Sequence, residues 1–331
     1  MQDNNSINKT KHHHHHRHHH RRKFWRIFGV VIAVVLVGIL LVVGYAYRNI
    51  QNAANNAYNP VSLKNQDNGS LSSVLKNKKP ISLLLLGTDT GEFGRTYKGR
   101  TDTMMIMVLD PQKNKTTIES IPRDMKVTLP DYPDYSPAKI NSAYTYGGIE
   151  EVDKTINEYF KVPINAYVLV NMKGLVKAID KVGGVDVVSP LSFDYEGYSF
   201  KKGVKYHMNG KKALQFGRMR YDDPKGDYGR QERQRLVIMA LLKKSANVQS
   251  VLNKDFLDSV SHSMQTNLSF NDMTTLAANY RKATDSISSG YVKGTNDNEE
   301  GVSYQNVSVN ERQRVSDKLR KALGLNEVTV K

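Results

Sequence analysis

The sequence predicts an α/β fold: a layered α/β/α domain with a mixed central sheet, preceded by a single transmembrane helix. Apolar residues run continuously over Ile81–Leu86 and Thr103–Leu109, as is typical of strands buried on both faces. Segments with helical spacing alternate with such strands from residue 80 onward, which favours helices layered on a sheet. A stretch of 21 residues without a charge, Ile27–Tyr47, precedes them.

The uncharged stretch has the length of a membrane span. About 20 apolar residues cross a bilayer core of roughly 30 Å, whereas a cleaved signal peptide has an apolar region of only about 7–15 residues. Small residues at Ala53–Ala57 leave cleavage open as the alternative. Residues 1–26 carry seven Lys or Arg against one acid, so the positive-inside rule keeps this end in the cytoplasm. We therefore predict a single-pass protein of the cell membrane with everything after Arg48 outside.

Composition narrows the partners. The chain has no cysteine and a formal net charge of +16, which excludes disulfides and thiolate chemistry and favours anionic partners. Because the bulk of the chain is expected outside the cell, nucleic acid is not expected among them. The histidine-rich run within residues 12–20 is compatible with metal binding or pH sensing but is more typical of a low-complexity tail.

Four segments are predicted along the chain: a cytoplasmic basic and His-rich tail (1–26), the transmembrane anchor (27–47), an extracytoplasmic linker (48–79) and a catalytic domain (80–325). A flexible linker of that length would span roughly 30 Å. Within the domain we expect strands at 81–86, 103–109, 116–121, 164–170 and 185–188, and helices at 149–160, 172–182, 211–216 and 231–244.

The carboxy-terminal part continues without a clear boundary. Ser269 followed by Asp272 predicts a capping box for a helix that reaches Lys282. The segments 289–293 and 302–307 are expected to pair as a hairpin across the polar loop 294–301. A last helix over 311–323 is expected to stop at Gly324.

Two acidic residues lie where the first strand ends and the second begins. Loops at the carboxyl ends of strands are where α/β folds place ligands, so Asp89 and Asp102 could hold a hard cation such as Mg²⁺. Arg100 and Asp102 stand two apart in an extended stretch, so both side chains are expected on one side. The alternative for each acid is to cap a turn. No Walker pattern accompanies the nearby glycines, and a nucleotide site is not supported.

Arginines gather in later loops. Arg123 leaves the end of a strand, and Arg218 and Arg220 are expected to share one face of an extended segment. Arg230 and Gln234 are four apart, so they would share one face of the helix that opens there.

That helix start is a candidate phosphate site. Arginines around the beginning of a helix bind phosphate oxygens well, although any single arginine can equally be ordinary surface charge. Asp227, just before this helix, would be its N-cap.

Five stretches resemble the LytR-CpsA-Psr family of bacterial cell-wall ligases. They cover residues 80–245 in the order of the family, and the motif positions show no departure from its pattern. The stretches are LLLLGTD, GRTDTMM, SIPRD, KINSAYTYGG and FGRMRYDDPKGDYGRQERQ.

The resemblance implies roles for individual residues. Asp89 and Asp102 would coordinate Mg²⁺, with Mn²⁺ as an alternative, either directly or through a pyrophosphate. Arg100, Arg123 and Asp102 would be catalytic, and a long apolar tunnel would enclose a polyprenyl chain. The pyrophosphate-binding set would be Arg100, Arg123, Lys139, Arg218, Arg220, Arg230 and Gln234.

The expected function is a phosphotransferase. It would move wall teichoic acid or capsular polysaccharide from a polyprenyl-pyrophosphate carrier to a peptidoglycan sugar hydroxyl. His207 and His262 lie outside the matching stretches, so the general base is left unassigned. The alternatives are a pyrophosphatase acting on the same lipid carrier and a non-catalytic lipid-binding regulator of the cell envelope.

Overall fold

The computed structural model describes residues 44, 47–49, 51–52, 54–61, 63, 70–89, 98–247 and 261–331. The chain divides into two units, Met1–Asn49 and Ile50–Lys331, and the α/β domain belongs to the second. The predicted tail 1–26 and nearly all of the predicted span 27–47 lie outside the described residues. Within the described part, no helix is both long and apolar enough to cross a membrane.

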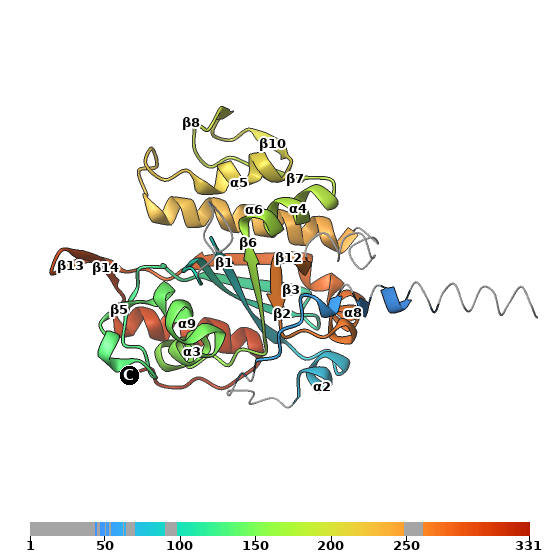
Figure 1. Cartoon of the computed structure of the whole chain (residues 1–331), viewed down its shortest axis with the longest axis horizontal. Coiled ribbons are helices and arrows are strands. Elements are labelled where there is room, and N and C mark those ends of the chain that lie inside the picture. The colour runs from blue at the N-terminus through green and yellow to red at the C-terminus, as the bar shows by residue number, and fades with distance from the viewer. Residues whose placement is uncertain are drawn as a thin grey trace, which may run out of the picture. The chain divides into compact units, whose positions relative to one another are not determined.

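A six-stranded mixed sheet forms the centre of the domain (Figure 1), as the sequence predicts. Its strand order is β11-β6-β1-β2-β3-β12. The pairs β1–β2, β2–β3 and β11–β6 are antiparallel, whereas β6 pairs with β1 and β12 pairs with β3 in parallel. The strands are β1 (Ile81–Thr88), β2 (Thr101–Asp110), β3 (Lys115–Ser120), β6 (Ala166–Asn171), β11 (Met264–Thr266) and β12 (Ser286–Tyr291).

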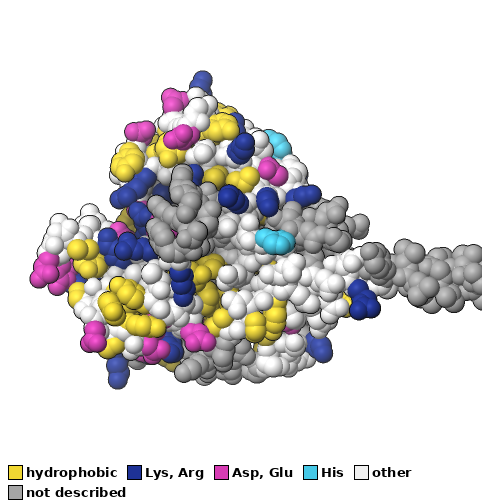
Figure 2. Space-filling view, in the orientation of Figure 1, with side chains coloured by type: hydrophobic (Ala, Val, Ile, Leu, Met, Phe, Trp, Pro, Cys, Tyr) yellow, Lys and Arg dark blue, Asp and Glu magenta, His cyan; other side chains and the backbone are white. Residues whose placement is uncertain are grey.

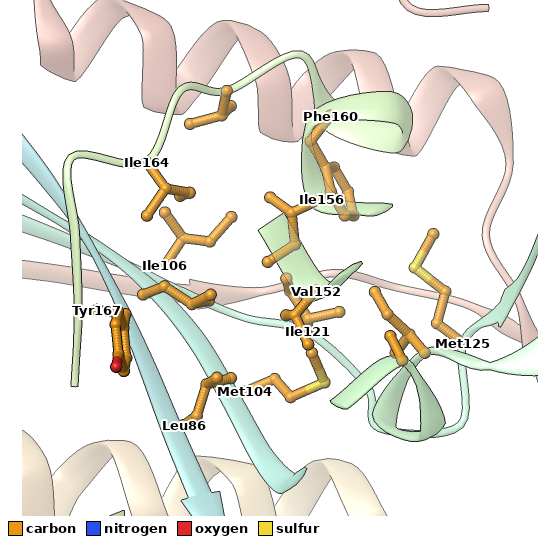
Figure 3. Close-up of a cluster of buried hydrophobic side chains, with 14 of the residues drawn as sticks. Leu86, Met104, Ile106, Ile121, Met125, Val152, Ile156, Phe160, Ile164 and Tyr167 are labelled. Atoms are coloured by element: carbon orange, nitrogen blue, oxygen red, sulfur yellow. The ribbon is translucent and has the colours of Figure 1, made fainter. Parts of the chain in front are cut away.

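Helices cover both faces of this sheet, which explains its unbroken apolar strands. Met104 and Ile106 of β2 pack with α3 (Ala143–Phe160) and α9 (Val309–Leu323) on one face (Figures 1 and 3). Met105 and Met107 pack on the other face with α6 (Asp227–Asn247) and α8 (Phe270–Asn279). Because successive side chains of a strand point to opposite faces, each strand contributes to two cores.

A smaller lobe with its own core stands on the α6 side of the sheet (Figure 1). Phe193, Phe200 and Phe216 pack ring against ring at its centre. The helix α4 ends as predicted before Gly183 and Gly184, whose φ values of 79° and 84° suit glycine. The lobe contains α4 (Met172–Lys181), β7 (Val185–Val188), β8 (Phe193–Tyr195), β9 (Tyr198–Phe200), β10 (Lys205–Met208) and α5 (Gly210–Arg218).

The predicted hairpin of 289–293 with 302–307 is wrong. Residues 286–291 form β12, an edge strand of the central sheet, and the hairpin instead joins β13 (Thr295–Glu299) to β14 (Val302–Asn306). Glu300 and Gly301 make its turn, both with positive φ (52° and 80°). A two-residue turn of this kind fixes the register of a hairpin, even though β13 carries only polar residues.

The remaining elements are short. The capping box of Ser269 and Asp272 is confirmed, although α8 ends at Asn279 and a 3-10 turn follows. Gly324 ends α9 in the left-handed conformation, as predicted. These short elements are α2 (Leu71–Lys76), β4 (Lys126–Val127), η1 (Pro133–Tyr135), β5 (Ala138–Lys139), η2 (Ile140–Ser142) and η4 (Arg281–Thr284).

Candidate functional site

A β-bulge sets the position of Asp102. Gly87 pairs with Thr103 and Thr88 pairs with Thr101, so Asp102 is the extra residue between two ladder positions. Bulges of this kind re-aim a side chain next to functional sites. Asp89 follows Thr88 directly, which puts both predicted acids at the same edge of two adjacent strands.

Gly87 is required by this arrangement. A Cβ at residue 87 would lie 2.9 Å from the Cβ of Thr103, closer than real Cβ atoms approach. The motif glycine therefore allows β1 and β2 to come together beside the bulge.

Alternating charges run from this edge to the start of α6. Arg123 Nη1 lies 2.9 Å from Asp102 Oδ2, and Arg123 Nε lies 3.7 Å from Asp227 Oδ1. Arg230 Nη2 lies 2.6 Å from the same Asp227 oxygen. Asn141 Nδ2 donates to the other oxygen of Asp102 at 3.0 Å. Two carboxylates thus hold two guanidiniums in fixed positions, and three elements of the fold meet here.

Burial of the charged Arg230 side chain in the series Asp102–Arg123–Asp227–Arg230 is electrostatically unfavourable. Its side chain is 11% exposed. Burial lowers its pKa, and the charges of Arg123 and Arg220 act in the same direction against those of Asp227 and Asp102. Arg230 Nε is buried without a hydrogen-bond partner. An anion that accepts a hydrogen bond from this group would relieve the cost, so the site suits phosphate oxygens.

The other predicted residues lie on several elements, and one expectation about them is wrong. Lys139 on β5 lies close enough for its charge to act on Asp124, and Gln234 packs against Gly217 of α5. Arg218 and Arg220 do not share a face of an extended segment. Arg218 is the last residue of α5, where the helix directs its guanidinium toward the sulfur of Met172.

Arg220 and Arg100 are the exposed members of the predicted set. Arg220 lines a cavity together with Asp227. Arg100 makes no ion pair with any residue that the structure describes. Lys and Arg side chains gather on the face where the small lobe meets the rest of the domain (Figure 2).

Sequence reasoning missed several members of the site. Asp227 is the first residue of α6 rather than its N-cap, and it binds two arginines. Gln231 Nε2 donates to Asp227 Oδ2 at 2.9 Å. The spacing of Asp227 from Arg230 and Gln231, three and four residues, was the available signal, since such residues are neighbours on a helix.

Asp124 was also missed. Burial raises its pKa, and the negative charge of Asp227 adds to the effect, while a hydrogen bond from its own backbone and the charges of Arg123 and Lys139 oppose it. Its Oδ1 is buried without a hydrogen-bond partner. The site therefore includes a carboxylate disposed to take a proton.

The carboxylate oxygens at this end of β1 and β2 suit Mg²⁺ only together with the oxygens of a bound substrate. Among the described residues there is no cluster of three or more His, Asp or Glu that could hold a metal ion. Mg²⁺ commonly binds through one or two carboxylates plus the phosphates of a substrate. Asp89 and Asp102 match that pattern, and the buried Oδ1 of Asn141, next to Asp102, has no hydrogen-bond partner.

The model of the LytR_cpsA_psr family matches residues 44–321. The chain belongs to this family. It is 40% identical over 304 residues to the polyisoprenyl-teichoic acid–peptidoglycan teichoic acid transferase TagU of Enterococcus faecalis, covering 90% of this chain and 97% of that protein. It is also 37% identical over 284 residues to biofilm regulatory protein A of Streptococcus mutans, covering 81% and 70% respectively.

The fold of this LytR-CpsA-Psr protein is also found in solved structures. The crystal structure of B. subtilis TagU superposes with a TM-score of 0.59 at 32% identity, covering 76% of this chain and 100% of that one. This chain therefore shares its overall fold with that crystal structure.

Proposed function

We propose that this chain is a membrane-anchored phosphotransferase of cell-wall assembly. It moves an anionic glycopolymer, wall teichoic acid or capsular polysaccharide, from a polyprenyl-pyrophosphate carrier to a peptidoglycan sugar hydroxyl. The observation that carries the proposal is the series Asp102–Arg123–Asp227–Arg230 at the edge of the sheet. The 40% identity to a teichoic acid transferase supports the same activity.

The arrangement suits phosphoryl transfer because that reaction needs charge neutralisation and alignment more than covalent help. The acceptor oxygen bonds to the polymer-proximal phosphorus while the bond to polyprenyl phosphate breaks, which leaves a phosphodiester between polymer and wall. Arg123 and Arg230 donate to the diphosphate oxygens, and Asp102 holds Arg123 in place. One well-placed donor contributes roughly 2.7–4 kcal/mol in a transition state.

The remaining cationic residues complete the proposed pyrophosphate site. Lys139 and Arg220 lie beside the central series, and Gln234 lies one helical turn beyond Arg230. Arg100 stands at the entrance to β2, and Arg218 at the end of α5. We propose that both turn onto the diphosphate when it binds.

Asp89 and Asp102 would hold Mg²⁺, or Mn²⁺ in its place, together with diphosphate oxygens, and the ion would neutralise part of the diphosphate charge. The protein residues would then align the acceptor and the leaving group. An apolar tunnel for the polyprenyl chain is part of the same proposal.

The proposed location is the cell membrane. Residues 27–47 would span the bilayer once, with the amino terminus in the cytoplasm and the domain outside. Both proposed substrates, the lipid-linked polymer and peptidoglycan, occur on that side, so nucleic acid is not among the proposed partners.

A transfer assay with the full-length protein tests the activity. The purified chain in liposomes would receive a lipid-pyrophosphate-linked saccharide carrying a radiolabel, with uncrosslinked peptidoglycan strands as acceptor. Label is expected in the peptidoglycan fraction. If only free saccharide phosphate accumulates, the chain is a pyrophosphatase.

The regulator alternative is favoured by one comparison, the identity to biofilm regulatory protein A. A non-catalytic binder would retain the lipid donor and release no product. Arg123→Ala separates the two, because a transferase loses turnover while a binder has none to lose.

A further inference from the structure

A polar cavity of about 560 Å³ lies beside the arginine series. The loop before α6 and the first turn of that helix form one wall, and the β13–β14 hairpin forms the opposite wall. The volume falls in the range of small-molecule sites, roughly 300–1,000 Å³. Its polar lining includes Asp124, Asp227, Gln231, Asn298, Ser303 and Gln305.

The cavity is joined to the proposed diphosphate site. Asp227 lines it and also binds Arg123 and Arg230, and Arg220 lines it as well. Asp124 lines it and directly follows Arg123 in the chain. A group bound in the cavity therefore lies next to a phosphate bound by Arg123.

Unpaired acceptors in this cavity indicate what kind of group it takes. Gln231 is only 5% exposed and its Oε1 has no hydrogen-bond partner, and Asp124 Oδ1 is likewise buried and unpaired. Buried polar atoms are normally paired, so these oxygens call for a donor. A phosphate dianion has no proton to donate. Sugar hydroxyls both donate and accept hydrogen bonds, so they can pair with these oxygens and with the amide and hydroxyl side chains that line the cavity.

The hairpin wall is held firmly in place. The Tyr228 hydroxyl accepts from the Gly294 N–H at 2.8 Å and donates to Gln305 Oε1 at 2.8 Å. The Gln305 backbone N–H donates to the Asp124 carbonyl at 2.8 Å. One residue of β14 thus ties the hairpin both to α6 and to the Asp124 loop, so the cavity is preorganised.

We propose that this cavity is the subsite for the acceptor saccharide, and that Asp124 receives the proton of the attacking hydroxyl. The inference rests on the proposed function and deepens it. The hydroxyl oxygen bonds to phosphorus, its proton passes to the Asp124 carboxylate, and the bonding pair of the broken P–O bond leaves with polyprenyl phosphate. Three charged groups face Asp124: Asp227 from α6, Lys139 from β5 and Arg123 from its own loop.

A cavity-filling variant of the full-length protein tests the subsite. Ser303→Trp places an indole in the cavity, whereas Val302→Trp, at the next position of β14 and not in the lining, is the matched control. We expect Ser303→Trp to raise the KM for peptidoglycan strands at least tenfold and to leave the KM for the lipid donor unchanged. Val302→Trp should alter neither constant. A second variant, Asn298→Ala, should raise the acceptor KM severalfold with unchanged thermal unfolding.

Two results would overturn the subsite. One is an unchanged acceptor KM in Ser303→Trp, and the other is a raised donor KM, which would place the donor's own sugar in the cavity. Failure of the proposed function is distinguishable, because then the wild-type chain itself transfers no label.

Asp124→Asn tests the proton transfer, since the amide has the same shape but cannot take a proton. We expect kcat to fall by about 10²–10⁴-fold, as for other general bases, with the donor KM unchanged. The acidic limb of the pH–kcat profile should disappear. A retained acidic limb, or a kcat near that of wild type, would show that the proton goes elsewhere.

Discussion

Arg123 Nη1 lies 2.9 Å from Asp102 Oδ2, and this pair joins the bulge in β2 to the loop after β3. Both residues are partly exposed, at 24% and 38% of their side chains, so a bound ligand can reach the guanidinium. Asn141 fixes the carboxylate from the other side. The ion pair therefore holds the Arg123 guanidinium in a fixed position. Preorganised donors of this kind stabilise the charge that develops in a transition state.

The first prediction concerns the guanidinium of Arg123, which pairs with Asp102 through Nη1 and with Asp227 through Nε. Arg123→Lys keeps the charge but offers a single ammonium, which cannot take both positions. Transfer should fall by about 10²–10³-fold with little change in thermal unfolding, measured by the labelled-donor assay. Lys113→Ala, which removes an exposed lysine paired with Asp110, is the control and should leave transfer unchanged. Near-normal transfer in Arg123→Lys would mean that charge alone matters.

The second prediction concerns the proposed metal. Chelation of divalent ions should abolish transfer, and added Mg²⁺ should restore it. Asp102→Asn weakens an oxygen ligand and should raise the Mg²⁺ concentration for half-maximal activity by tenfold or more. Asp186→Asn, on the exposed surface of the small lobe, serves as the control. Full activity in the presence of chelator would remove the metal from the proposal.

Much of the fold could be predicted because it depends on local patterns. The apolar runs of β1 and β2 and the helix ends before Gly183 and Gly324 follow from residues that are adjacent in the sequence. The hairpin was misplaced because β13 is entirely polar, and its register comes from a two-residue turn rather than from an apolar pattern.

The site could be predicted only in part, for a related reason. The motif stretches contain the central arginines and acids, but the partner of each residue is set by packing between distant elements. Asn141 reaches Asp102 only because η2 packs against β2, and Arg218 turns to Met172 only because α5 packs on α4. From the sequence alone Asp227 resembles a helix cap, because the sequence does not show that Arg123, in the loop after β3, lies against it.

The third prediction is a dependence of stability on pH at Glu311. Burial alone would raise the pKa of Glu311, but hydrogen bonds from Arg314 and from the Lys293 backbone outweigh it and hold the pKa below its ordinary value. A lowered pKa contributes stability above the ordinary value near 4.3, and this contribution is lost as the pH falls through the folded-state pKa. Glu311→Gln should therefore destabilise the protein by about 1 kcal/mol at pH 7.

The measurement for Glu311 is thermal unfolding of the full chain at pH 7 and at pH 3. Wild type and Glu311→Gln should differ at pH 7, and the difference should be smaller at pH 3, because it is lost as the carboxylate takes a proton. The exposed ion pair of Lys161 with Glu158 offers a control, since Glu158→Gln should change little at either pH. An equal difference at both pH values would mean that shape, not charge, is responsible.

The last prediction concerns Tyr228, whose hydroxyl links α6 to the β13–β14 hairpin through Gly294 and Gln305. Tyr228→Phe keeps the ring packed 5.0 Å from that of Tyr291 but leaves a backbone N–H and an amide oxygen without their partner. The cost should be about 1–2 kcal/mol of stability. Because the hairpin loses one of its anchors, amide hydrogen exchange over residues 295–306 should accelerate, and the acceptor KM should rise. Tyr221→Phe, at a side chain that is 93% exposed, should do neither. If exchange in the hairpin stays slow in Tyr228→Phe, the contact of Gln305 with Asp124 alone holds the cavity wall.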